Sequence, residues 1–188
     1  SEIKKFVEET ELNSIIIDIK DYSGTISIND ESLQTNDTAG CKVRDMMEFI
    51  GELHESKIYV IGRVTVFQDP YYTKLHPDLA VQSKSGGVWR DRKGLSFIDV
   101  GAKEYWDYII DLSKKSYALG FDEINFDYIR YPSDGNMADA QYSLTVGTST
   151  KSEMLESFFS YLHNNLKDTG VKTSADIFGY ATLLTDDL

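Results

Sequence analysis

The stretch Gly120-Phe-Asp-Glu-Ile-Asn-Phe-Asp-Tyr-Ile-Arg-Tyr-Pro-Ser-Asp-Gly135 decides the fold of this chain. From position 123 to position 128 polar and apolar residues alternate, so the two kinds of side chain point to opposite faces, as they do in a β-strand. Glycines bound the segment, and Pro132 disfavours helix at the residue before it. The stretch therefore predicts a short strand that carries Glu123, Asn125 and Asp127 on one face.

Further strands and helices are predicted on both sides of this segment. Runs of β-branched residues predict strands, and apolar stripes at helical spacing predict helices. In chain order we expect a helix over 3–11, a strand over 14–21, a helix over 43–53, a strand over 57–67, a helix over 102–119 with Asp99 as its cap, the strand described above, a helix over 151–167 and a strand over 171–178. Two long polar stretches, 68–95 and 134–150, are predicted to be loops, and loops of this length often carry function.

Strands that alternate with helices predict an α/β fold with a parallel sheet and right-handed crossovers. A (β/α)8 barrel and an open doubly wound sheet both fit this order. The glycine-rich phosphate loop of many doubly wound folds follows none of the predicted strands, which favours the barrel. A barrel builds its active site at the C-terminal ends of its strands. Asp18, Arg63, Asp127 and Asp176 each fall near the end of a different predicted strand.

Composition narrows the function. The 188 residues, of which 41% are hydrophobic and 27% charged, indicate a single globular domain over 1–188. A net charge of −12 argues against a nucleic-acid partner, because binding to phosphate backbones needs a basic surface. No apolar run approaches the roughly 20 residues that cross a bilayer, so no membrane span is expected. The single cysteine, Cys41, fits the cytoplasm and equally the outside of a bacterium.

The chain closely resembles the glycosyl-hydrolase-like family DUF4015 in five motifs that occur in the same order. These are Ile-Ile-Asp-Ile-Lys-Asp at 16–21, His-Pro-Asp-Leu-Ala-Val at 76–81, Gly-Gly-Val-Trp-Arg-Asp at 86–91, the segment 120–135, and Ser-Ala-Asp-Ile-Phe-Gly at 174–179. The resemblance covers nearly the whole chain and implies a (β/α)8 TIM barrel, of which this chain supplies about strands two to five.

A complete barrel takes roughly 250 residues, which agrees with a partial barrel. The remaining strands are then deleted, not shown, or supplied by another chain, and self-association through exposed barrel edges is open. This fragment alone is expected to be inactive.

The resemblance implies glycoside hydrolysis, which usually needs two carboxyl groups. Asp127 falls on strand four, where similar barrels commonly carry the nucleophile, and Asp176 at the end of strand five is the expected general acid. The alternative for Asp127 is a structural ion pair with Arg63 or Arg130. A carboxyl separation of roughly 5 Å gives retention of configuration and one of about 6.5 to 9.5 Å gives inversion. Retention is expected by analogy alone.

Seven other residues are candidates for contact with sugar: Asp18, Lys20, Arg63, Trp89, Asn125, Arg130 and Tyr131. Asp18 and Lys20 either bind sugar hydroxyls or hold Arg63 in place. Asn125 either orients Asp127, with which it shares a face, or binds a hydroxyl. Rings in loops, including Trp89, Tyr128 and Tyr131, either stack on sugar or pack their own loops down.

No cofactor is predicted. The histidines and the cysteine lack zinc-site spacing. Asp18, Asp127 and Asp176 could in principle hold a divalent cation, but Arg63 and Lys20 nearby make a metal unattractive, so none is predicted.

The expected partner is a polysaccharide or oligosaccharide, with the bacterial cell envelope as its expected source. The expected location is extracellular or at that envelope, with the cytoplasm left open. Two other functions stay open. One is a barrel that binds carbohydrate without turnover, and the other is a metal-dependent hydrolase of a different ester or amide.

Overall fold

Four parallel strands form the main sheet of the protein in the computed structural model, which describes residues 2–28, 45–145, 147 and 149–179. The strands are β1 (Ser14–Lys20), β2 (Tyr59–Thr65), β4 (Glu123–Asp127) and β6 (Lys172–Ala175), and they lie in that order. Strands that follow one another in the chain are therefore neighbours, without the reversal of strand order that marks a doubly wound sheet. The fold is a partial (β/α)8 barrel, as predicted.

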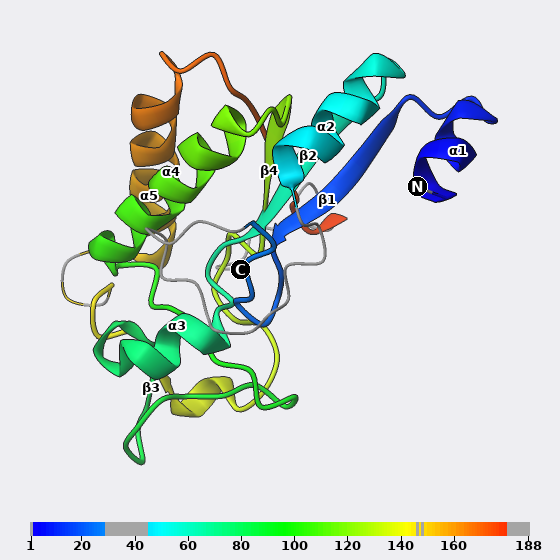
Figure 1. The fold of residues 1–188 in the computed structure, drawn as a ribbon. Coiled ribbons are helices and arrows are strands. Elements are labelled where there is room, and N and C mark those ends of the chain that lie inside the picture. The colour runs from blue at the N-terminus through cyan, green and yellow to red at the C-terminus, as the bar shows by residue number, and fades with distance from the viewer. Residues whose placement is uncertain (1, 29–44, 146, 148, 180–188) are drawn as a thin grey trace.

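The four main helices are α1 (Glu2–Glu8), α2 (Met46–Glu55), α4 (Lys103–Ala118) and α5 (Lys151–Leu166). Figure 1 shows α2, α4 and α5 along one face of the sheet, where α2 contacts β2 and α4 contacts both β4 and α5. The predicted helices are confirmed, with ends that differ by a few residues; positions 43 and 44 lie outside the described residues. None of the helices in the described part of the chain is long and apolar enough to cross a membrane.

The core lies between the sheet and these helices. Alternate side chains of β2 and β4 point into it, because successive residues of a strand face opposite sides. Buried members of the core include Val60, Val64, Ile124 and Phe126 of the strands and Ile50, Leu53, Ile109, Leu112, Phe158 and Leu162 of the helices. The other side chains of β2 and β4 face the interior of the barrel, and most of these are polar.

The two long stretches predicted to be loops contain short regular elements. The first holds α3 (Pro70–Leu75), η1 (Pro77–Leu79) and β3 (Gln82–Ser83), and the second holds η2 (Met137–Asp139) and β5 (Ala140–Gln141). β3 pairs with β5 in antiparallel fashion, so the two stretches are joined. Figure 1 shows α3 and β3 beyond the C-terminal ends of the strands.

Asp99 is not the cap of α4, so that prediction is wrong. The residue before the helix is Ala102, which makes no capping hydrogen bond with its side chain. Asp99 is fully buried and accepts hydrogen bonds from the Gly101 N–H (3.0 Å), the Leu144 N–H (2.9 Å) and the Thr145 hydroxyl (2.6 Å). Its carboxylate therefore ties the loop after β5 to the start of α4, a contact between distant segments that local sequence does not signal.

A β-bulge interrupts β1 next to its C-terminal end. Asp18 pairs with Arg63 and Lys20 pairs with Val64, so Ile19 is an extra residue without a partner in β2. Because each extra residue reverses the direction of the following side chain, Asp18 faces the barrel interior whereas Lys20 faces the helices. A regular strand would put Asp18 and Lys20 on one face, and the bulge separates them.

Gly62 occupies a position in β2 with no room for a side chain. A Cβ atom there would lie 2.2 Å from Cδ1 of Ile19 and 2.9 Å from Cδ1 of Phe121, both fully buried. We expect Gly62→Ala to lower the free energy of unfolding by about 1 to 3 kcal/mol through overpacking, measured by urea denaturation followed by circular dichroism. Gly51→Ala in α2 is the control, since a Cβ there meets nothing within 4 Å, and we expect that variant to gain about 1 kcal/mol of stability. A Gly62→Ala protein as stable as wild type would contradict the prediction.

Candidate active site

The two predicted catalytic carboxylates lie together at the C-terminal end of the sheet. Asp127 is the last residue of β4, and Asp176 follows the last residue of the neighbouring strand β6. Both line one cavity of about 170 Å³, together with Tyr128, Arg130, Ile177 and Phe178. The Asp176 N–H donates to the Phe126 carbonyl oxygen at 2.9 Å, which extends the pairing of the two strands up to the cavity.

The carboxylate of Asp127 accepts a hydrogen bond from the backbone and faces a cation at a longer distance. Its Oδ1 accepts a hydrogen bond from the Tyr128 N–H at 2.7 Å, and Tyr128 adopts a left-handed backbone conformation with φ of 51°. Its Oδ2 lies 4.0 Å from Nη1 of Arg63. A separation of 4.0 Å is the limit of an ion pair, so Asp127 is not tied into a tight structural pair with Arg63.

Arg63 is instead bound to Asp18 across β1 and β2. Its Nε donates to Oδ1 at 2.6 Å and its Nη2 donates to Oδ2 at 3.1 Å, which is the bidentate geometry of a strong pair. The hydrogen bond to Asp18 is the main cause that raises the pKa of Arg63, and Asp127 and Asp176 raise it further. Of the two predicted roles for Asp18, the structure shows the one that holds Arg63, which fixes a positive charge 4.0 Å from Oδ2 of Asp127.

Asn125 contacts Asp176 and not Asp127. It is 7% exposed, and its Nδ2 donates to Oδ1 of Asp176 and to Oγ of Ser174, both at 3.1 Å. Ser174 in turn donates to Oε1 of Glu123 at 2.5 Å. The prediction that Asn125 orients its strand neighbour is wrong, because residues two apart on a strand point in parallel, whereas the residue on the next strand lies within reach.

Lys20 does not reach the cavity, so its predicted contact with substrate is wrong. The bulge turns it toward the helices, where it is 0% exposed and its Nζ lies 2.9 Å from Oδ2 of Asp69. The same Nζ donates to the Thr65 carbonyl oxygen at 2.6 Å. Burial lowers the pKa of Lys20, and the neighbouring carboxylate of Asp69 opposes that shift. Lys20 is part of the core.

Trp89 and Tyr131 are also buried, at 2% and 0% exposure, so neither is a platform for sugar. The Trp89 Nε1–H donates to the Asn136 carbonyl oxygen at 3.0 Å. The Tyr131 hydroxyl lies 3.1 Å from the Thr145 hydroxyl, and its ring packs edge-on against Tyr142. Both rings therefore pack the long loops against each other, which was the alternative for them.

Arg130, a predicted contact for sugar, lines the cavity. Its guanidinium lies 4.3 Å from the ring centre of Phe178 and 5.2 Å from that of Tyr128. No described carboxylate lies within ion-pair distance of it, so the predicted alternative of a pair with Asp127 is not present. Burial lowers the pKa of Arg130.

Two aromatic residues, one in the cavity and one in the hollow beside it, were not predicted from the sequence as site residues. Phe178 lines the cavity with the carboxylates, and Tyr22 lines the hollow beside it. Tyr22 and Phe178 follow β1 and β6 by two and three residues, but the predicted strands run to positions 21 and 178, so the sequence alone did not mark Phe178 as a residue beyond a strand end. No group of three or more His, Cys, Asp or Glu side chains placed to hold a metal ion occurs in the described ranges.

The model of the DUF4015 family, described as "Putative glycosyl hydrolase domain", matches residues 1–188. This chain belongs to the DUF4015 family. A hypothetical protein from Ruminiclostridium thermocellum, solved by crystallography, shares 31% sequence identity with this DUF4015 domain. The match has a TM-score of 0.79 and covers 95% of this chain and 90% of that one.

Two glycosidases share the fold at lower identity. Alpha-L-fucosidase isoenzyme 2 from Paenibacillus thiaminolyticus is 12% identical with a TM-score of 0.67, over 92% of this chain and 28% of that one. TtGalA, an alpha-galactosidase from Thermus thermophilus, is 15% identical with a TM-score of 0.59, over 95% of this chain and 35% of that one. At these identities the likeness concerns the fold alone, and the DUF4015 domain spans about a third of either enzyme. No curated protein matches the chain.

Proposed function

We propose that the DUF4015 domain belongs to a glycoside hydrolase that cleaves a glycosidic bond in a polysaccharide with two carboxyl groups, Asp127 and Asp176. One observation carries this proposal: carboxylates from neighbouring strands line the same cavity of about 170 Å³ at the C-terminal end of a barrel sheet. That end is where barrel enzymes build their sites, and a pair of carboxyl groups is what hydrolysis of a glycosidic bond requires.

The surroundings of the two carboxylates favour different roles. Asp127 is half-buried, accepts a backbone hydrogen bond and faces the positive charge of Arg63, so its carboxylate is held in one position, as a nucleophile or base needs. Asp176 is more exposed and accepts from the neutral amide of Asn125, which suits a group that exchanges a proton. In this scheme Asp176 gives its proton to the glycosidic oxygen while the bond to the anomeric carbon breaks. Asp127 then attacks that carbon, or removes a proton from the water that does so.

We further infer that the substrate is a polysaccharide of the cell envelope and that the protein acts outside the cytoplasm. Cell fractionation that finds the full-length protein only in the cytoplasm would refute this location.

The first screen incubates the full-length protein with a panel of envelope and storage glycans and measures new reducing ends. Binding without new reducing ends would favour a carbohydrate-binding barrel instead, and loss of activity with a chelator would favour a metal-dependent hydrolase.

Aryl glycosides provide a test of the role of Asp176. TtGalA, which shares the fold, was solved with p-nitrophenyl alpha-D-galactopyranoside, and a nitrophenolate departs without protonation. We expect Asp176→Asn to lower kcat/KM on an oligosaccharide by about 100-fold or more and to lower it far less on the matching nitrophenyl glycoside. Asp168→Asn, at an exposed carboxylate between α5 and β6, is the control and should leave both values unchanged. Equal losses on the two substrates would remove Asp176 from the role of general acid.

A further inference from the structure

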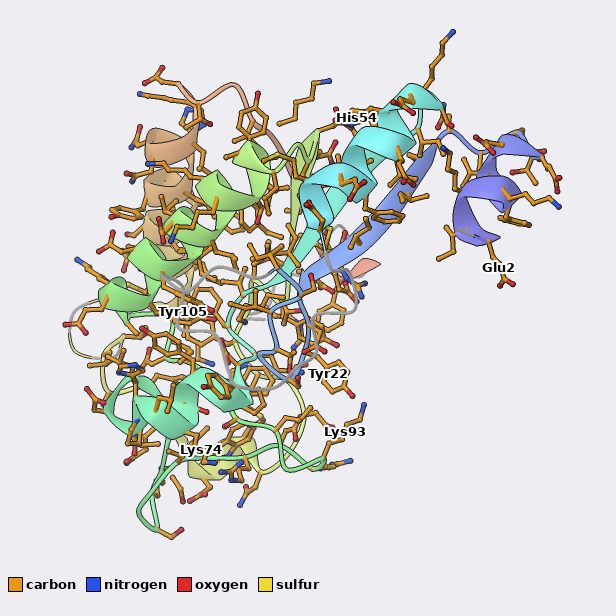
Figure 2. All side chains as sticks on the ribbon, viewed as in Figure 1. Glu2, Tyr22, His54, Lys74, Lys93 and Tyr105 are labelled. Carbon is orange, nitrogen blue, oxygen red and sulfur yellow. The ribbon has the colours of Figure 1, made fainter. Side chains whose placement is uncertain are left out.

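A second hollow of about 340 Å³ adjoins the cavity that holds the two carboxylates. Tyr128 and Arg130 line both spaces, so the hollow and the cavity share a wall. Tyr22 and Lys93 line the hollow from loops, and Figure 2 shows both at the loop end of the molecule, opposite the end that carries His54. A ligand that extends from the cavity past Tyr128 and Arg130 therefore reaches this hollow.

The carboxylates of the hollow have hydrogen-bond or ion-pair partners, whereas its cations have no ion-pair partner among the described residues. Two of its residues are acidic, and both carboxylates are engaged: Asp134 pairs with Arg92 at 3.3 Å, and Asp91 accepts hydrogen bonds from the N–H groups of Lys93 and Leu95 at 2.8 Å. The two cations, Lys93 and Arg130, make no ion pair with any residue in the described part of the chain. The hollow therefore holds two cationic side chains that have no carboxylate partner among the described residues, on a protein whose net charge is −12.

Arg130 is held in a fixed orientation. Its Nη1 donates to Oγ of Ser133 at 2.8 Å and to the Tyr131 carbonyl oxygen at 3.3 Å, and its guanidinium lies against the rings of Tyr128 and Phe178. Its Nε and Nη2 make no hydrogen bond to a described residue, so these donors are open to a ligand. Two N–H groups side by side on a guanidinium match the two oxygens of a carboxylate.

We propose that this hollow binds an anionic sugar unit, a uronate, beside the sugar whose bond is cleaved. The carboxylate of the uronate accepts from Arg130 and Lys93, and the exposed ring of Tyr22, at 57% exposure, covers an apolar face of the sugar. This inference rests on the proposed glycosidase function only for the cleavage of the neighbouring sugar, because binding of the uronate does not require turnover. It narrows the substrate class from polysaccharides in general to acidic ones.

Binding to a variant that cannot turn over the glycan tests this site separately from hydrolysis. Calorimetry on full-length protein with Asp127→Asn would compare short oligosaccharides of glucuronate and galacturonate with their carboxyl-reduced counterparts, in which each carboxylate is a primary alcohol. We expect an acidic form to bind about tenfold or more tightly than its reduced counterpart, and the preference to fall as salt is raised. Lys93→Gln and Arg130→Gln should each remove most of the preference. Lys114→Gln, which removes the same charge from the exposed face of α4, should retain it.

Three results would overturn the site: no binding of any acidic form, equal binding of acidic and reduced forms, or a preference that both Lys93→Gln and Arg130→Gln leave intact. Lys93 is exposed, so its substitution tests the site even where Arg130→Gln impairs folding. The proposed function fails in a different way, when wild-type protein releases no reducing ends from any glycan. An acidic preference that persists in that case supports the site as a binding site for acidic sugars without turnover.

Discussion

Asp127→Asn is expected to abolish glycoside hydrolysis, with a fall in kcat/KM of about a thousandfold or more and no loss of fold. The asparagine keeps the shape of the side chain and can still accept from the Tyr128 N–H, as Oδ1 of Asp127 does at 2.7 Å. It removes the negative charge that would attack the anomeric carbon or take a proton from water. A positioned acid or base alone contributes about 100-fold to 10,000-fold, and loss of a nucleophile costs at least as much.

The measurement is release of reducing ends from the best glycan of the panel, with circular dichroism as the check on folding. Asp168→Asn removes an equal charge from an exposed site after α5 and should keep wild-type turnover. Wild-type turnover in Asp127→Asn would exclude this residue from the mechanism and leave Asp176 without its partner. An equal loss of turnover in Asp168→Asn would show that the change in net charge, and not the loss of a catalytic group, lowers activity.

Lys20→Met is expected to lower the free energy of unfolding by about 3 to 5 kcal/mol, since it leaves one charge of a buried pair without its partner. Asp69, whose side chain is 1% exposed, faces Nζ of Lys20 at 2.9 Å. It also accepts from the Tyr105 hydroxyl and the Tyr72 N–H, both at 2.8 Å. Without Lys20 two neutral donors remain against a buried negative charge. A loss of this size is a large part of the roughly 5 to 15 kcal/mol that stabilises a typical domain.

Urea denaturation of matched variants measures this effect. Lys114→Met, at an exposed position in α4, should change stability by less than about 0.5 kcal/mol. The double variant Lys20→Met with Asp69→Asn removes both charges and should be more stable than Lys20→Met alone, because the remaining amide still accepts from Tyr72 and needs no counter-charge. A single variant as stable as wild type would show that the pair contributes nothing net.

The order of elements and the strand-end carboxylates could be predicted from local sequence. Alternation over 123–128 identifies a strand with one polar face, and the repeated order of helix and strand identifies a parallel sheet. Given the barrel, Asp127 and Asp176 come together because the C-terminal ends of neighbouring parallel strands lie at one edge. Each of these inferences uses residues that are near one another in the chain, or a rule that holds for every parallel sheet.

The predictions that are wrong concern residues whose environment is built by distant segments. One extra residue in β1 turns Lys20 from the barrel interior to Asp69 in the core. Trp89 and Tyr131 become buried because the stretch before α4 packs on the stretch after β4, through pairing between β3 and β5. No periodicity reports a two-residue strand pair or a single bulge, because each involves too few residues to form a pattern.

The sequence by itself thus determined the α/β class, the parallel order of the strands and the two carboxylates at strand ends, since periodicity and strand direction follow from local backbone geometry. Tertiary structure alone decided which polar residues face the cavity. It bound Arg63 to Asp18, Lys20 to Asp69 and Asn125 to Asp176, and it brought Tyr22, Lys93 and Arg130 to one hollow. The reason is physical: a side chain's partner is set by what lies within a few ångströms of it in space, and in a barrel most of those neighbours come from other strands and loops.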